Sequence, residues 1–96
     1  MCEMNGPTDT TDLRREVATR LRRTREAFKM GQGEFAAAAG IAFNTYNQYE
    51  QGARLMRLEN AIALCDRFDI TLDWIYRGDT SGLPLKTWRM IQGTVP

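Results

Sequence analysis

Apolar residues recur every three or four positions along most of the chain, and this spacing predicts a series of short helices. The first helix is expected to be capped by Thr11 or Asp12, whose side-chain oxygens can accept from the exposed N–H groups of a first turn. It should end near residue 29 or 30. Its apolar face consists of Leu13, Val17, Leu21 and Phe28, with Thr24 between them.

Two further helices are predicted on either side of a glycine. Residues 32–39 include four consecutive alanines, which combine high helix propensity with little bulk, so another helix can approach closely. Gly40 then ends this helix, because glycine tolerates the positive φ of a tight turn. A third helix is expected over residues 42–51, with Tyr46 and Tyr49 facing inward.

The second half of the chain predicts two more helices and a short helical tail. One helix should cover residues 57–68, and its apolar positions are Leu58, Ala61, Ile62 and Cys65. The next should cover residues 72–76 behind a Thr71 cap. In the tail, residues 85–92 can form two turns between Pro84 and Gly93. The tail face is expected to contain Leu85, Trp88 and Ile91, with Trp88 mostly buried.

This series of helices without an alternating strand pattern predicts an all-α fold, a compact bundle of about five short helices. The length of 96 residues suits one domain and is too short for two cores. We divide the chain into a polar N-terminal arm over residues 1–10, a helical domain over 11–78 and a tail over 79–96. The tail helix is expected to pack on its own domain or on a second subunit, and the sequence leaves both open.

Composition argues against most enzymatic and metal chemistry. The chain contains no histidine, which removes the commonest general base and excludes a Ser-His-Asp triad. Two cysteines, Cys2 and Cys65, are too few for a metal cluster or a disulfide framework. We therefore expect no enzyme activity, no metal, no cofactor and no small-molecule ligand. With no apolar run of about 20 residues and no secretory h-region, we also expect no membrane segment. Cys65 lies in an apolar run and is expected to be a buried thiol, which suits a reducing cytoplasm.

The net charge of +1 conceals an uneven distribution along the chain. Residues 1–12 carry a net charge of −3, and residues 59–96 carry −1. Residues 13–58 contain nine basic and four acidic side chains, a net charge of +5. Clustered arginine suits a polyanionic partner, although a solvated arginine-rich helix would give the same composition.

The segment 32–52 reads as a helix, a turn centred on glycine and a second helix, which is the arrangement of a helix-turn-helix. The second helix of this motif is the third helix of the chain, expected over residues 42–51. Its outward side is uncharged and mostly amide-bearing: Phe43, Asn44, Asn47 and Gln48. Asparagine and glutamine can pair bidentately with adenine, and phenylalanine can pack on a thymine methyl group. The second helix is therefore the expected recognition helix.

The same segment resembles the helix-turn-helix of phage repressor and Cro-type regulators, the XRE family. The family pattern Gln-x-x-apolar-Ala-x-x-x-Gly-apolar is matched by Gln32, Phe35, Ala36, Gly40 and Ile41, and the resemblance continues to about residue 78. It implies a lambda repressor-like fold. The chain departs from the pattern at Ala42, where Ser or Thr is usual, at Tyr46, where a smaller residue is usual, and at Leu55 and Met56.

The resemblance also implies roles for individual residues. Base contacts are expected from Phe43, Asn44, Asn47 and Gln48. Phosphate contacts are expected from Gln32, Thr45, Gln51 and Arg54. The family also typically carries an Arg–Glu pair, here Arg25 and Glu50, which we expect to join the first and third helices as a partly buried ion pair.

These features predict a sequence-specific regulator of transcription that binds double-stranded DNA, acting as a repressor by occupying an operator. Because one recognition helix reads only a few base pairs, a homodimer is expected. The alternative is a helix-turn-helix module that binds another protein, such as an antitoxin. Steep salt dependence of duplex binding would distinguish the two, because phosphate contacts release counterions.

Overall fold

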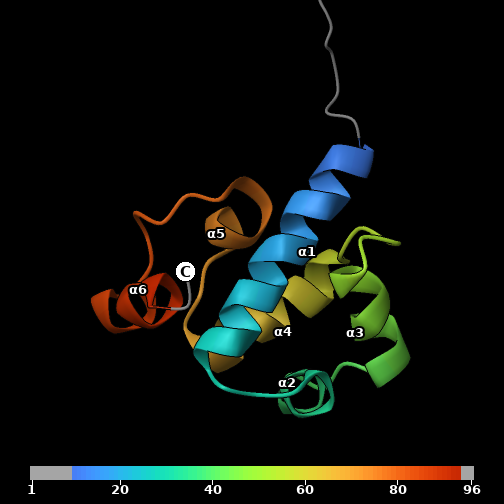
Figure 1. Cartoon of the computed structure of the whole chain (residues 1–96), viewed down its shortest axis with the longest axis horizontal. Coiled ribbons are helices and arrows are strands. Elements are labelled where there is room, and N and C mark those ends of the chain that lie inside the picture. Colours follow the sequence, from blue (N-terminus) through green and yellow to red (C-terminus); the bar gives the residue numbers. More distant parts are fainter. Residues whose placement is uncertain (1–9, 94–96) are drawn as a thin grey trace, which may run out of the picture.

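The computed structural model describes residues 10–93, which form a bundle of six helices and contain no strand in that range. Figure 1 shows α1 crossing the middle of the molecule, with α2 and α3 on one side and α6 on the other. The helices are α1 (Thr10–Ala27), α2 (Gln32–Ala38), α3 (Phe43–Glu50), α4 (Leu58–Phe68), α5 (Leu72–Arg77) and α6 (Leu85–Gln92). The all-α fold expected from the sequence is confirmed.

Helix α1 is the central element, and α3, α5 and α6 all pack against it. Val17 and Leu21 are almost completely buried on its inner face. Thr24, the polar member of this face, is buried too, and its hydroxyl donates to the Arg20 carbonyl (2.7 Å) and accepts from Trp74 Nε1 (2.9 Å). The hydrogen bonds explain how a threonine is accommodated in the core.

The predicted cap of α1 is wrong. The helix already includes Thr10, so Thr11 and Asp12 lie inside its first turn, and the Thr11 hydroxyl instead accepts from Arg14 Nη2 (3.4 Å). The helix also ends two residues before position 29, because Lys29 adopts a φ of 57°. By contrast, the predicted Thr71 cap of α5 is confirmed, with Oγ1 accepting from Trp74 N at 3.0 Å.

The turn between α2 and α3 has the predicted geometry. Gly40 has a φ of 73°, in the left-handed region that favours glycine. Phe35 on α2 contacts the Tyr46 ring on α3, with centroids 5.5 Å apart, and stacks on the Phe68 ring at 4.4 Å. Ala36 is buried, so the small side chain allows the close crossing that the sequence suggested.

The prediction for the apolar face of α4 is partly wrong. Ala61 is buried as expected, together with Leu64 and Phe68, but Leu58 is 57% exposed and Ile62 is 43% exposed. Positions 61, 64 and 68 follow helical spacing and face the core, whereas positions 58 and 62 lie on a neighbouring row of the helix surface. Helix α4 therefore has apolar residues on more of its circumference than the core covers.

The tail forms α6, which packs on α1. Its most deeply buried residues are Thr87 and Ile91, while Trp88 is partly buried against the core. Leu85, which the sequence placed on the inner face, is 61% exposed. With Thr87 and Ile91 inward at i and i+4, position 85 lies on the outer side of the helix. The predicted arm lies mostly outside the described residues.

Candidate nucleic-acid interface

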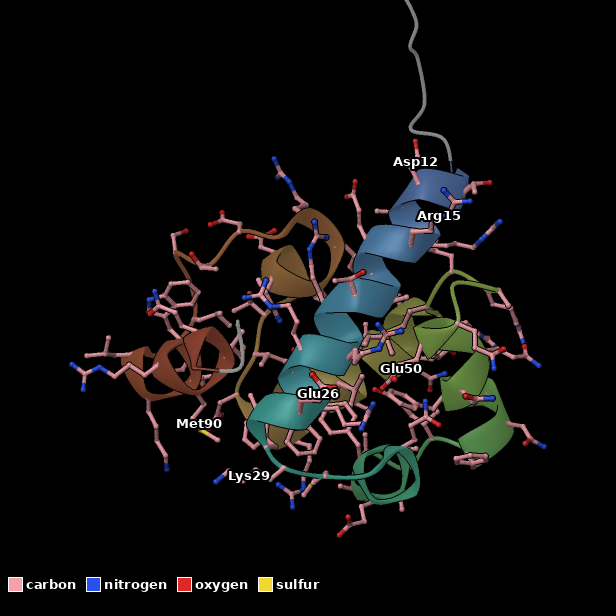
Figure 2. All side chains as sticks on the ribbon, in the orientation of Figure 1. Asp12, Arg15, Glu26, Lys29, Glu50 and Met90 are labelled. Atoms are coloured by element: carbon pink, nitrogen blue, oxygen red, sulfur yellow. The ribbon has the colours of Figure 1, made fainter. Side chains whose placement is uncertain are left out.

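A buried polar network holds α3 against α1 and α2, with Glu50 at its centre. Figure 2 shows Glu50 between α1 and α3. Its carboxylate accepts from Arg25 through Nε at 2.6 Å and Nη2 at 3.1 Å, which makes a bidentate ion pair. The same carboxylate accepts from the Tyr46 hydroxyl and from Gln32 Nε2 at 3.1 Å. Four donors from three helices thus converge on one side chain, and the position of α3 is fixed by directional bonds.

The protonation states of this network follow from its surroundings. Burial acts to raise the pKa of Glu50, but the hydrogen bonds from Arg25, Tyr46 and Gln32 outweigh it, and the pKa lies below its ordinary value. The hydrogen bond to Glu50 raises the pKa of Arg25. Burial and the neighbouring Glu50 carboxylate raise the pKa of Tyr46. The network therefore combines a carboxylate, a guanidinium and a neutral phenol at neutral pH.

The opposite side of α3 carries the predicted base-contacting residues. Phe43 is 51% exposed, Asn44 is exposed, and Asn47 and Gln48 are partly exposed. Tyr46, Tyr49 and Glu50 face the protein, so the two groups occupy opposite sides of a single helix. Ala42 is the N-cap and makes no side-chain cap hydrogen bond, as the departure from the family pattern implies.

The predicted phosphate-contacting residues border this exposed side at different places. Thr45 is partly exposed, Gln51 is exposed, and Arg54 follows α3 in an exposed loop. Arg54 Nη1 approaches Gln48 Oε1 at 3.5 Å, which brings a predicted phosphate contact beside a predicted base contact. Gln32 differs, because one of its amide N–H groups is already donated to Glu50. An amide nitrogen carries two N–H groups, so Gln32 retains one for a second hydrogen bond.

The sequence did not indicate the residues that hold the loop after α3. Arg14 on α1 donates through Nε to the Gly52 carbonyl at 3.1 Å, and Gly52 has a φ of 72°. The Tyr49 hydroxyl accepts from Asn60 Nδ2 at 2.8 Å, which ties the first turn of α4 to α3. Such contacts depend on chain segments far apart in sequence, and only the aromatic residue at position 49 gave a signal.

The part of the chain that the structure describes contains no cluster of metal-ligating side chains. Within residues 10–93, no group of three or more His, Cys, Asp or Glu side chains is placed to hold a metal ion. The helices in that range are also too short or too polar to cross a bilayer. What the described residues do offer is an anchored helix with an uncharged hydrogen-bonding side.

Comparison with known proteins identifies the class to which this arrangement belongs. Residues 21–75 match the sequence model of a helix-turn-helix family, which covers more than half of the chain. The protein is therefore a member of this helix-turn-helix family, and the resemblance to the XRE family of phage repressor-type regulators is confirmed. Membership supports a DNA-binding regulator of transcription.

One curated relative is the cryptic phage CTXphi transcriptional repressor RstR of Vibrio cholerae serotype O1. It is 31% identical over 58 residues, which cover 60% of this chain and 52% of that protein. The chain thus matches about half of the length of this relative. No solved structure gives a match.

Proposed function

We propose that the protein is a sequence-specific, double-stranded DNA-binding repressor that acts by occupying an operator. The observation that carries this proposal is the division of α3 into an anchored side and an exposed side of uncharged hydrogen-bonding residues. A helix held by the Glu50 network can present amide groups to base edges in the major groove in a fixed orientation. The family membership and the similarity to a phage repressor support the same conclusion.

In this proposal, some residues on and around α3 contact bases and others contact phosphates. Phe43, Asn44, Asn47 and Gln48 contact base edges and determine the sequence, because amide groups distinguish donor and acceptor patterns in the major groove. Phosphate contacts set the register of the protein on the duplex without reading sequence. We assign them to Gln32, Thr45, Gln51 and Arg54. Binding to DNA would place the protein in the cytoplasm.

A homodimer belongs to the same proposal. One α3 can reach only a few base pairs, and the many competing sites of a genome demand a longer recognition sequence. Two copies related by a two-fold axis read two half-sites about one helical turn apart. Selection of binding sites from random duplexes tests this directly, since a homodimer should give a two-fold symmetric consensus.

The second candidate is a protein-binding module, such as an antitoxin. The exposed Phe43 ring favours it, since a large apolar side chain on an otherwise polar helix also suits a protein interface. Binding of selected duplexes should be measured at several salt concentrations. Phosphate contacts release counterions, so a steep fall in affinity with salt supports the repressor. Failure of the selection to enrich any sequence, with flat salt dependence, would favour the protein-binding module.

A further inference from the structure

The first part of α4 and the loop before it display an apolar surface that the fold leaves uncovered. Leu55 is 36% exposed, Leu58 57% and Ile62 43%, and these are three of the five large apolar side chains exposed in residues 10–93. Leu58 and Ile62 are four residues apart on α4, so they share one face of the helix. We call Leu55, Leu58 and Ile62 the α4 surface.

The α4 surface lies next to the recognition helix. Asn60 Nδ2 donates to the Tyr49 hydroxyl at 2.8 Å, and the Arg57 backbone N–H approaches the same oxygen at 3.5 Å. Both contacts hold the first turn of α4 against α3. In Figure 1 the loop between the two helices emerges at the end of α3 that is far from α2. A molecule bound to the α4 surface would therefore sit beside α3 and leave the exposed side of α3 open.

The charges around the α4 surface are self-complementary. Arg57 and Glu59 flank Leu58, and they pair with each other at 3.2 Å with side chains 61% and 71% exposed. In an interface with two-fold symmetry, a residue at the axis meets its own counterpart, and a residue beside the axis that contacts a second residue of the other copy receives the same contact in return. Two copies meeting at Leu58 can therefore exchange partners, with Arg57 of each copy facing Glu59 of the other.

Helix α6 offers a competing apolar position, Leu85, which is 61% exposed. Figure 1 places α6 and α3 on opposite sides of α1, along the 42 Å long axis of the molecule. Two copies joined through α6 would hold their recognition helices at the far ends of the assembly. Half-sites one turn apart are only about 34–36 Å from centre to centre. Two copies joined through the α4 surface would bring their α3 helices closer together, because the first turn of α4 is held against α3.

We propose that the α4 surface binds the α4 surface of a second copy of this chain in a two-fold dimer. The inference rests on the proposed function, because the distance between DNA half-sites is what favours α4 over α6 as the dimer interface. Three aliphatic side chains on each copy make a small interface, below the size of most stable complexes. The free protein is therefore a reversible dimer, and a duplex with two half-sites strengthens the association by raising the effective concentration of the second copy.

The test uses the full chain with Leu58→Glu and the matched control Leu85→Glu, which places the same charge on another exposed leucine. Sedimentation equilibrium over a concentration series should show the wild type rising from 11.0 kDa toward twice that mass. Because the change occurs twice in a symmetric dimer, Leu58→Glu should weaken dimerisation at least about a hundredfold. Leu85→Glu should behave as the wild type. Circular dichroism checks that both variants remain folded.

Charge reversal tests whether Arg57 of one copy pairs with Glu59 of the other. Arg57→Glu and Glu59→Arg should each weaken the dimer, since like charges then face each other across the interface. The double variant should restore the wild-type dimerisation. If the two residues interact only within one copy and the dimer forms elsewhere, both single variants should dimerise as the wild type does, which would contradict the exchanged pairs.

Several outcomes would overturn the proposal. These are a Leu58→Glu variant that dimerises normally, loss of the dimer in Leu85→Glu, or a wild type that stays monomeric at every concentration. Failure of the proposed function looks different: the wild type would dimerise through the α4 surface, yet random duplexes would yield no selected sequence. If both proposals hold, Leu58→Glu binds a duplex with one half-site as the wild type does but loses the gain from a second half-site.

Discussion

The two sides of α3 differ in chemistry and in what their side chains contact. On the inner side, Glu50 is 4% exposed and accepts hydrogen bonds from three other side chains. On the outer side, Asn44 and Phe43 are exposed to solvent. The inner side is saturated by the protein itself, whereas the outer side keeps its hydrogen-bonding capacity for a partner. The comparison teaches that the residues that fix the position of α3 are separate from those that remain available to a partner.

The largest effect is expected when the inner side is broken at Glu50. Glu50→Ala leaves the Arg25 guanidinium, whose side chain is 16% exposed, without its carboxylate. Removing one partner of a buried pair should lower the free energy of unfolding by about 3 kcal/mol. Urea unfolding monitored by circular dichroism measures the change.

A matched control is available for this comparison. Arg20 is also 16% exposed, but its partner Glu16 is 59% exposed. Glu16→Ala should therefore cost less than about 1 kcal/mol. Equal losses from Glu50→Ala and Glu16→Ala would show that burial of the carboxylate does not set the strength of the inner network.

Substitution on the outer side should leave stability unchanged and alter recognition instead. Asn44→Ala is expected to change the free energy of unfolding by less than about 0.5 kcal/mol. It should reduce discrimination at particular base pairs by about 1–3 kcal/mol, because a bidentate contact is lost. Gln48→Ala is expected to act in the same way at other base pairs. Competition binding against single-base variants of a selected duplex measures both.

Arg54→Ala is the matched control for sequence reading. Removal of a phosphate contact should weaken binding to all duplexes alike and reduce the salt slope by about 1. If the amide variants bind the selected duplex with wild-type affinity and selectivity, the outer side of α3 is not the reading surface.

A smaller loss of stability is expected from Tyr46→Phe. This substitution removes the hydroxyl that donates to the Glu50 carboxylate and keeps the aromatic ring. A hydrogen bond to a charged group contributes about 1.5–3 kcal/mol, and the variant should lose an amount near the lower end. The pKa of folded Glu50 is below its ordinary value of 4.5, so the stabilisation is present above that pH and is lost as the pH falls through the folded pKa. The variant should therefore show a smaller drop in stability between pH 7 and pH about 3.

Tyr76→Phe provides the comparison for this pH dependence. The Tyr76 hydroxyl donates to the Met56 carbonyl at 2.9 Å, an acceptor without charge. Its removal should lower stability by about 1 kcal/mol at both pH values. An identical pH dependence in the two variants would contradict the role assigned to the Tyr46 hydroxyl.

The smallest effect is a gain in stability at the start of α3. Ala42 occupies the N-cap with extended backbone angles and no side-chain hydrogen bond, so Ala42→Ser can supply the missing acceptor. The substitution should raise the free energy of unfolding by about 1 kcal/mol. The same change at Ala37, an exposed position inside α2, should be slightly destabilising because serine competes with helical hydrogen bonds. Thermal unfolding of the two variants separates capping from a general effect of serine.

The sequence predicted the local parts of the fold better than the tertiary ones. Gly40 forms the turn between α2 and α3 because it tolerates a positive φ, and Ala36 allows the close crossing of the two helices because its side chain is small. The Thr71 cap was likewise a local feature. The ends of α1 were predicted wrongly, because a lysine gives no sequence signal for the positive φ that Lys29 adopts and Thr10 was not expected to be helical.

Tertiary burial accounts for most of the remaining differences. Periodicity placed Leu58, Ile62 and Leu85 on apolar faces, but only the packing of α4 and α6 decides which part of a face the core covers. The bond from Tyr46 to Glu50 and the bond from Arg14 to Gly52 were not foreseen. The Arg14–Gly52 bond joins residues 38 positions apart, which only the folded chain brings together. Tyr46 and Glu50 are four positions apart on α3, so helical spacing already placed them side by side.

The location of the Phe43 and Asn44 side chains outside the Glu50 network has a consequence for how such a protein can diversify. Because neither side chain supports the core, substitutions at these positions can accumulate without loss of folded protein. Under the proposed function, a lineage could therefore exchange one target sequence for another through intermediates that all remain folded. The barrier to a new specificity would then lie in the DNA that must change with it and not in the stability of the chain.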